Sequence, residues 1–386
     1  DLCKLYFGCK MVLFNFVSIK AGGGQQNALS FLENIKTEIL IFKYVVACTE
    51  NTLVHRYCVE NGIEVFVVKN NIKSRILFEF FGFIKINSKY NIKTIFTIFG
   101  SAPLISFNVY KISGCAYSNI FQPEIDIWCY LGGIKKKLKK IIDFFRIFSL
   151  YQSDEIILET EFLKKKALSG ILKNKKVSVI EMAPSKLITD NLRNIESINL
   201  YKEIYNFLYL SGPQPNKRID KFLDVIFFLN KDSSKKYILK LTMPEDSNYF
   251  KEILYPKIKK LNIEDYVVNL GTIVPQNVSR VIQSSDAIVN VALIESFSNN
   301  WVEAWASNRL LISTDADWSR ASCKEAALYI DVLKPEIASS LIKNIFNNLE
   351  AFSIYLENGK KRLKEMPTSR ERTKQYISLI NNSLES

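Results

Sequence analysis

Short apolar runs alternate with segments of helical spacing along most of this chain, and no other feature constrains its fold as strongly. The first run, MVLFNFVSI from Met11, is short and rich in β-branched and aromatic residues, as in a buried strand. It ends near three consecutive glycines at 22–24, and helical spacing follows from Gln25 to Ile35. Strands that alternate with helices in this way predict a parallel sheet covered on both faces.

The alternation occurs in two series. The first continues with strands expected at 38–47, 65–69, 93–99, 154–158 and 176–180, and with a helix at 51–61. The second has strands expected at 207–211, 237–242, 267–270, 287–291 and 310–313, separated by helices at 217–229, 250–261, 276–284 and 300–307. We therefore predict an α/β protein with two doubly wound, Rossmann-like domains that face a cleft.

The domain limits follow from where each series begins and ends. We place the first domain at 11–195 and the second at 196–364. Residues 365–386 have helical spacing and are expected to pack back on the first domain. Residues 1–10 precede Met11 and fit no pattern that follows, so we interpret them as an extension.

Composition narrows the class of protein. The chain has 386 residues, 48% hydrophobic and 24% charged, which is typical of a globular protein. No uncharged apolar stretch reaches about 18 residues, so we expect no transmembrane helix and a cytoplasmic protein. The 7 cysteines are scattered without a Cys-x-x-Cys pair, and His55 is the sole histidine. This pattern argues against a Cys/His zinc site or a Ser/His/Asp triad, and it favours reduced thiols.

Positive charge is concentrated in the first half of the chain. The net charge is +13, and residues 1–200 carry 27 Lys and Arg against 17 Asp and Glu. A basic half indicates an anionic partner, and lipid headgroups, nucleotides and nucleic acid all qualify. Two segments, Ser74–Lys89 and Lys135–Leu150, combine apolar stripes with lysines. Such segments can lie on an anionic membrane surface, and the alternative is a helix packed on the sheet with its lysines in solvent.

Two basic or glycine-rich motifs follow expected strands. Gly23 and Gly24 would let a ligand approach the backbone at a helix amino end, where N–H groups can bind phosphate. Lys217 and Arg218 open a helix after the first strand of the second series, where two cations can neutralise a diphosphate. The alternatives are a tight strand-to-helix turn for the glycines and solvated helix residues for the two cations.

The segment from Ile294 to Ala306 carries the strongest motif. Glu295 follows a strand and Glu303 lies on the next helix, eight residues later. Backbone N–H groups of Phe297, Ser298 and Asn299 would stand at the helix entry and bind an anion. Two carboxylates beside an anion site favour a ligand with hydroxyl groups, such as ribose or a sugar. The alternative is two ordinary surface glutamates.

This segment resembles the glutamate, seven residues, glutamate motif of retaining GT-B glycosyltransferases of family four. Three further segments follow that family's order and spacing: NLGTI at 269–273, VIQSSDAIVNV at 281–291 and EAALYID at 325–331. The resemblance is dense over 207–345 and thin over 1–206. It implies a GT-B fold, a nucleotide-sugar donor, and transfer of a hexose with retention of anomeric configuration. It also implies that no metal or other cofactor is needed.

The resemblance assigns roles to individual residues. Glu295 matches the glutamate that contacts donor-sugar hydroxyls, and Glu303 matches the one that holds the ribose hydroxyls. Lys217 matches the lysine that neutralises the donor diphosphate. The remaining donor-binding matches are Phe297, Ser298 and Asn299, through their amides, and Gly23 and Gly24. The arginine that precedes the family's lysine is absent, and Arg218 is the candidate substitute.

The resemblance also implies partners and a location. The acceptor would be a glycan or a lipid-linked oligosaccharide in the biosynthesis of a surface polysaccharide, such as lipopolysaccharide O-antigen or capsule. The protein would then lie peripherally on the inner face of the cytoplasmic membrane. A sugar-nucleotide epimerase on the same fold is one alternative. A basic nucleic-acid-binding protein is another, although no RNA or DNA module is recognisable and we expect no nucleic-acid partner.

Overall fold

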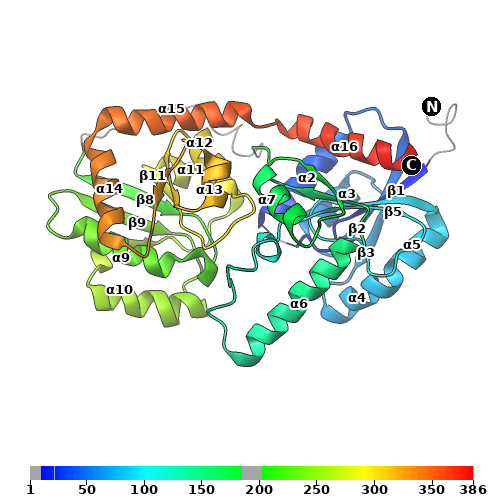
Figure 1. The fold of residues 1–386 in the computed structure, drawn as a ribbon, viewed down its shortest axis with the longest axis horizontal. Coiled ribbons are helices and arrows are strands. Elements are labelled where there is room, and N and C mark those ends of the chain that lie inside the picture. The colour runs from blue at the N-terminus through cyan, green and yellow to red at the C-terminus, as the bar shows by residue number, and fades with distance from the viewer. Residues whose placement is uncertain (1–9, 21, 185–201, 386) are drawn as a thin grey trace. The chain divides into compact units, whose positions relative to one another are not determined.

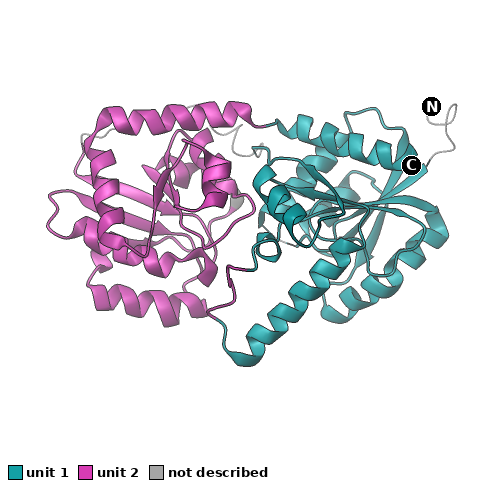
Figure 2. Cartoon of the chain, in the orientation of Figure 1, with its two compact units in different colours: residues 1–123, 131–185, 367–386 teal, residues 124–130, 186–366 magenta. Residues whose placement is uncertain are grey.

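The computed structural model describes residues 10–20, 22–184 and 202–385 (Figure 1). Residues 1–9 of the interpreted extension and the expected domain boundary at 195/196 therefore lie outside the described residues. The chain divides into two compact units (Figure 2). Unit 1 comprises residues 1–123, 131–185 and 367–386, and unit 2 comprises 124–130 and 186–366. Each unit contains one parallel sheet with helices on it, which confirms the predicted fold class.

The sheet of unit 1 has seven strands in the order β3-β2-β1-β4-β5-β6-β7, and all of its pairings are parallel. The strands are β1 (Lys10–Asn15), β2 (Phe42–Thr49), β3 (Val65–Val68), β4 (Ile92–Thr97), β5 (Tyr110–Gly114), β6 (Glu155–Leu158) and β7 (Lys176–Val179). Val12, Leu13 and Phe14 of β1 have no exposed surface, because β1 is a central strand with both faces covered.

The helices of unit 1 are α2 (Gly22–Ile35), α3 (Leu53–Glu60), α4 (Ile72–Leu77), α5 (Phe83–Tyr90), α6 (Gly133–Tyr151), α7 (Glu161–Ser169) and α16 (Ser369–Glu385), with a π-helical turn η1 (Phe78–Gly82) and a 3₁₀ turn η2 (Ser118–Ile120). The C-terminal helix α16 packs on α2 and β4. The Tyr376 ring lies 5.8 Å from that of Phe31, and the hydroxyls of Ser383 and Thr94 are 2.8 Å apart. This helix thus completes one face of the first sheet.

Two glycines shape the carboxyl ends of β4 and β5. A Cβ at Gly114 would lie 1.8 Å from the carbonyl oxygen of Ile98, so only glycine fits there. Gly100 has φ +116° and donates its N–H to the Gly114 carbonyl at 2.8 Å. A pocket described below opens over these two glycines.

The sheet of unit 2 has six parallel strands in the order β10-β9-β8-β11-β12-β13. They are β8 (Ile204–Tyr209), β9 (Lys236–Leu241), β10 (Val267–Asn269), β11 (Ala287–Asn290), β12 (Leu310–Thr314) and β13 (Leu328–Ile330). The strand order reverses between β8 and β11, and ligands of open parallel sheets bind at the carboxyl ends of strands at such a switch point.

The helices of unit 2 cover this sheet. They are α9 (Ile219–Asn230), α10 (Tyr255–Leu261), α11 (Pro275–Gln283), α12 (Asn299–Ala306), α13 (Asp317–Cys323), α14 (Pro335–Asn347) and α15 (Leu349–Glu365), with short turns η3 (Pro215–Lys217), η4 (Phe250–Leu254) and η5 (Glu264–Tyr266). Phe346 of α14 is almost fully buried, with ring centroids 4.8 Å from Tyr205 and 5.3 Å from Phe207 and from Phe352. These aromatic contacts hold α14 and the start of α15 on β8.

Among the described residues, no helix combines the length and the apolar character that crossing a bilayer requires.

Candidate functional site

The segments after β8 and β11 meet at the switch point of unit 2. The two strands are adjacent and parallel, with Ala287 paired with Phe207. Their carboxyl ends therefore open at the same edge of the sheet. The Leu293 N–H donates to the carbonyl of Asn216 at 2.8 Å, which ties the two loops together. The fold thus brings side by side the two segments that carry Lys217 and Glu295.

Lys217 and Glu295 form an ion pair, with Nζ donating to Oε1. The two side chains are 21% and 14% exposed, so water screens this pair less than it screens a surface pair. The Tyr209 hydroxyl donates to the carbonyl of Lys217 and fixes the backbone below the ammonium group. A lysine ammonium group carries three N–H donors, so Lys217 can hold Glu295 and donate to an anion at the same time.

The loop before α12 is held in place by two asparagines. Asn290, at the end of β11, donates from Nδ2 to the Ser298 hydroxyl at 2.7 Å. Asn300 donates from Nδ2 to the carbonyl of Leu210 at 2.9 Å, just after β8. Phe297 and Ser298 are buried, and Asn299 is the first residue of α12. The amino end of α12, whose first N–H groups have no partner within a helix, is therefore fixed beside the Lys217 and Glu295 loops.

Glu303 is a buried carboxyl group on α12. Glu303 is 7% exposed, and its Oε2 atom has no hydrogen-bond partner among the described residues. Burial raises the pKa of the Glu303 carboxyl to about 7. A buried carboxyl group without a compensating partner costs stability, and such groups gather at functional sites. Glu303 is thus a carboxyl group that a ligand's hydroxyl donors could satisfy.

Arg218 interacts with groups other than those of the Lys217–Glu295 ion pair. It caps α9 with φ 58°, a left-handed conformation that few residues other than glycine adopt. Burial lowers the pKa of its guanidinium group, and the negative charges of Asp331 and Asp220 oppose that shift. The cation is therefore partly balanced by the protein's own carboxylates.

Gly23 and Gly24 lie in unit 1, in the first turn of α2. A Cβ at Gly24 would meet the Ile19 side chain at 3.5 Å, an ordinary contact distance. Packing therefore does not require glycine at position 24.

Unit 1 contains a pocket of about 310 Å³ at the carboxyl ends of β4 and β5. Arg75, Glu79 and Arg146 line it, and none of these was predicted to be a site residue. The available signal was that Arg146 interrupts an apolar segment and that Arg75 directly precedes one. Among the described residues, no group of three or more His, Cys, Asp or Glu side chains is placed to hold a metal ion.

No protein-family model matches this chain, and neither does any curated protein sequence. Its fold, however, is similar to several solved structures. A glycosyltransferase from Rickettsia africae superposes with a TM-score of 0.72 and 14% identity over 98% of this chain and 100% of the other. Sucrose-phosphate synthase from Thermosynechococcus elongatus gives a TM-score of 0.75 and 12% identity over 97% and 99% of the two chains.

HepE from Anabaena, solved in complex with UDP and glucose, gives a TM-score of 0.69 and 13% identity over 97% of this chain and 100% of that one. Likeness at these identities establishes the fold. The chain therefore has the GT-B glycosyltransferase fold, as its motifs predicted.

Proposed function

We propose that this protein is a glycosyltransferase that moves a hexose from a nucleoside-diphosphate sugar to an acceptor. The observation that carries the proposal is the Lys217–Glu295 pair beside the amino end of α12, at the switch point of the second sheet. A cation, oriented N–H groups and a carboxylate at one sheet edge suit a ligand with both a diphosphate and hydroxyl groups. Solved structures of the similar protein HepE contain UDP-glucose and UDP.

In this proposal each site residue contacts one part of the donor. Lys217 and the amides of Phe297, Ser298 and Asn299 bind the diphosphate, because a lysine and a helix amino end both attract phosphate. Glu295 accepts hydrogen bonds from the hydroxyls of the donor sugar. Glu303 accepts those of the ribose. The further donor-binding residues are Arg218, Gly23 and Gly24, on the phosphate side.

The proposed transfer retains the anomeric configuration and belongs to the family-four type of reaction. A bond forms between the acceptor oxygen and the anomeric carbon, while the bond from that carbon to the diphosphate oxygen breaks. The bonding electrons go to the diphosphate, whose leaving oxygen takes the acceptor's proton. Lys217 and the α12 amides stabilise the negative charge that develops on the leaving group. We propose that no metal takes part.

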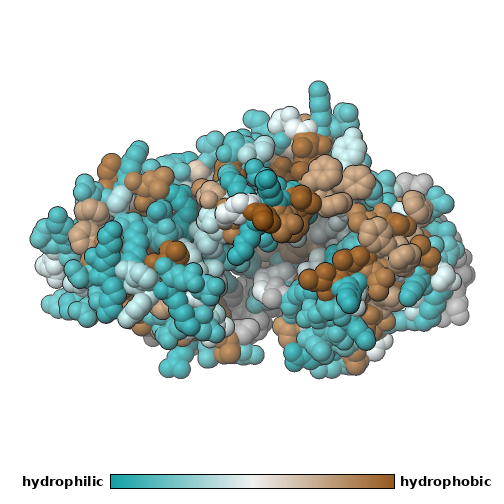
Figure 3. Space-filling model, turned by 90° about the horizontal axis from the view of Figure 1, so that it is seen from below, coloured by the Kyte–Doolittle hydropathy of each residue, from teal (hydrophilic) through white to brown (hydrophobic). Residues whose placement is uncertain are grey.

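We further propose that the acceptor is a glycan or a lipid-linked oligosaccharide used to build a surface polysaccharide. The support is helix α6, which carries lysines at 135, 136, 137, 139 and 140 and exposes apolar side chains such as Phe144, at 64%. Hydrophobic side chains gather on the unit 1 part of the face seen in Figure 3. A basic amphipathic helix of this kind lies at a membrane interface. The protein would work in the cytoplasm, peripherally on the inner face of the membrane.

The test is donor consumption. Wild type is incubated with UDP-, GDP-, dTDP- and ADP-sugars and a bacterial glycolipid extract, and the released nucleoside diphosphate is measured. We expect one donor to be consumed, a loss of at least a hundredfold in Lys217→Ala, and nearly unchanged turnover in Lys221→Ala. Lys221 is the matched control because it lies four residues on and pairs with Asp220 instead. No consumption of any donor, or equal turnover in the two variants, would contradict the proposal.

A further inference from the structure

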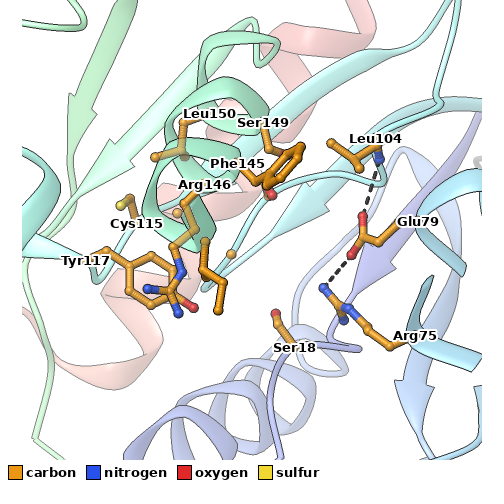
Figure 4. Close-up of a pocket in the computed structure, with 14 residues that line it drawn as sticks. Ser18, Arg75, Glu79, Leu104, Cys115, Tyr117, Phe145, Arg146, Ser149 and Leu150 are labelled. Atoms are coloured by element: carbon orange, nitrogen blue, oxygen red, sulfur yellow. Dashed lines mark hydrogen bonds and ion pairs between the residues drawn. The ribbon is translucent and has the colours of Figure 1, made fainter. Parts of the chain in front are cut away.

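The pocket of unit 1 lies between two helical segments that come from different parts of the chain. Arg75 on α4 and Glu79 on η1 form one side, and Phe145 and Arg146 on α6 form the other. The floor includes Gly100 and Gly114, at the ends of β4 and β5. Figure 4 shows Arg75 and Arg146 on two sides of the pocket, with Ser18 between them. All the lining residues belong to unit 1.

Arg75 has a hydrogen-bond donor that none of the described residues accepts. Its Nη2 pairs with Glu79 Oε1 at 2.6 Å, while its Nη1 is buried and has no partner among the described residues. The second carboxyl oxygen of Glu79 accepts the Leu104 N–H at 3.3 Å. Both oxygens of Glu79 are therefore engaged. An unmade hydrogen bond on a buried charged donor costs free energy, which a ligand oxygen would recover once the Arg75 side chain turns Nη1 towards the pocket.

Arg146 is held in a fixed orientation at the opposite side. Its Nη1 pairs with Asp143 Oδ1 at 2.8 Å, and its guanidinium lies 3.9 Å from the centroid of the Tyr117 ring. The other Asp143 oxygen accepts from Asn119 at 3.0 Å. A guanidinium group fixed by an ion pair and by stacking loses little freedom when it binds an anion. Glu79 and Asp143 each neutralise one of the two arginines, so an anion is attracted here by the oriented guanidinium groups and not by an excess of positive charge.

The rest of the lining is apolar and continues onto the surface. Leu104, Ile142, Phe145 and Leu150 contribute hydrocarbon walls. On α6 the exposed apolar residues Ile141, Phe144 and Phe148 each directly precede a lining residue in the sequence, so they lie beside the pocket. On the other side, Leu77, Phe80 and Phe81 of α4 and η1 are also exposed. A ligand that contacts both the two arginines and these apolar side chains has an anionic group and a long hydrocarbon chain.

We propose that this pocket binds the phosphate of a long-chain lipid phosphate between Arg75 and Arg146, while the hydrocarbon chain lies along the exposed apolar side of α6. The inference rests on the proposed function in one respect, because it names the lipid phosphate as the carrier of the acceptor. The lysines of α6 add an attraction for the phosphate-rich surface in which such a lipid is embedded.

The experiment titrates the full-length protein with dodecyl phosphate, below its micelle concentration, by isothermal calorimetry. Dodecanol and inorganic phosphate serve as the two half-ligands. We expect dodecyl phosphate to bind at least tenfold more tightly than either of them. Arg146→Gln and Arg75→Gln should each weaken it at least tenfold. Lys165→Gln, which removes the same charge from an exposed position of α7, should change it less than twofold.

Three results would overturn the inference. They are no binding of dodecyl phosphate, equal binding of dodecanol or inorganic phosphate, and unchanged affinity in both arginine variants. Arg146→Lys keeps the positive charge and is expected to recover part of the affinity, and the response of each variant to the active nucleoside diphosphate shows that it is folded. If the nucleotide binds and dodecyl phosphate does not, the lipid-phosphate site is wrong and the proposed function stands. The opposite pattern rejects the proposed function and keeps the site.

Discussion

Replacement of Glu303 by glutamine should make the protein more stable and less able to bind its donor. The Glu303 carboxyl group is buried, and its Oε2 atom has no partner among the described residues. Its pKa is about 7 in the folded protein against an ordinary value of 4.5, and burial is the cause. Glutamine has the same shape and carries no charge, so the variant removes the cost of a buried carboxylate.

The magnitude follows from the difference between the two pKa values. Because the folded-state pKa is the higher one, ionisation costs nothing below pH 4.5, and the cost grows as the pH rises towards 7. Above pH 7 the cost of ionising Glu303 in the folded protein reaches its full value. At about 1.4 kcal/mol per pKa unit, the difference between the two pKa values corresponds to about 3 kcal/mol. The variant should therefore gain little stability over wild type at pH 5. Its gain at pH 8 should exceed its gain at pH 5 by about 2–3 kcal/mol.

The assay is thermal unfolding of wild type and Glu303→Gln from pH 5 to pH 8, with and without the active nucleoside diphosphate. We expect the melting point of the variant to exceed that of wild type by several degrees at pH 8 and by little at pH 5. The stabilisation by the nucleotide should be weaker in the variant. Glu264→Gln is the control, because Glu264 is exposed beside Lys259 and should give no such gain. A gain that does not depend on pH, or a loss at pH 8, would refute the reasoning.

Three further outcomes are expected. Glu295→Ala should lower donor turnover more than tenfold, since it removes the carboxylate proposed to hold the donor sugar; turnover within tenfold of wild type would refute that role. Gly114→Ala should abolish soluble expression, because its Cβ would lie 1.8 Å from the Ile98 carbonyl oxygen, whereas Gly212→Ala has open space and should behave as wild type. Cosedimentation with vesicles containing anionic lipid should fall as salt rises, and Phe144→Asp should weaken it at every salt concentration. Cosedimentation that ignores both salt and Phe144→Asp would contradict the proposed membrane contact.

The strand and helix pattern could be predicted well where the apolar runs were long. The run from Met11 became β1, and that from Phe207 became β8, each within a few residues. Strand β5 was not predicted, because its sequence YKISG has one aliphatic side chain and two residues of low strand propensity. The burial of β5 comes from its neighbours β4 and β6 rather than from its own composition.

The candidate site of unit 2 was predictable in part. Lys217 and Glu295 are 78 residues apart, and only the predicted doubly wound fold could bring them to one edge of a sheet. Their ion pair depends on side-chain packing that spacing does not encode. So does the burial of Glu303, whose Oε2 has no partner in the part of the chain that the structure describes. The pocket of unit 1 was missed for a similar reason. Arg75 and Arg146 lie in the two segments interpreted as membrane-surface segments or as helices packed on the sheet, and their common pocket arises from the tertiary fold.

The most direct test of the account is a calorimetric titration of wild type with nucleoside diphosphates and with the corresponding nucleosides. In the proposed site, Lys217 and the amino end of α12 bind a diphosphate. One diphosphate should therefore bind at least a hundredfold more tightly than its nucleoside, and Lys217→Ala should remove most of that difference while Lys221→Ala keeps it. Equal affinity for the diphosphate and the nucleoside, or the same difference in Lys217→Ala, would contradict the central claim.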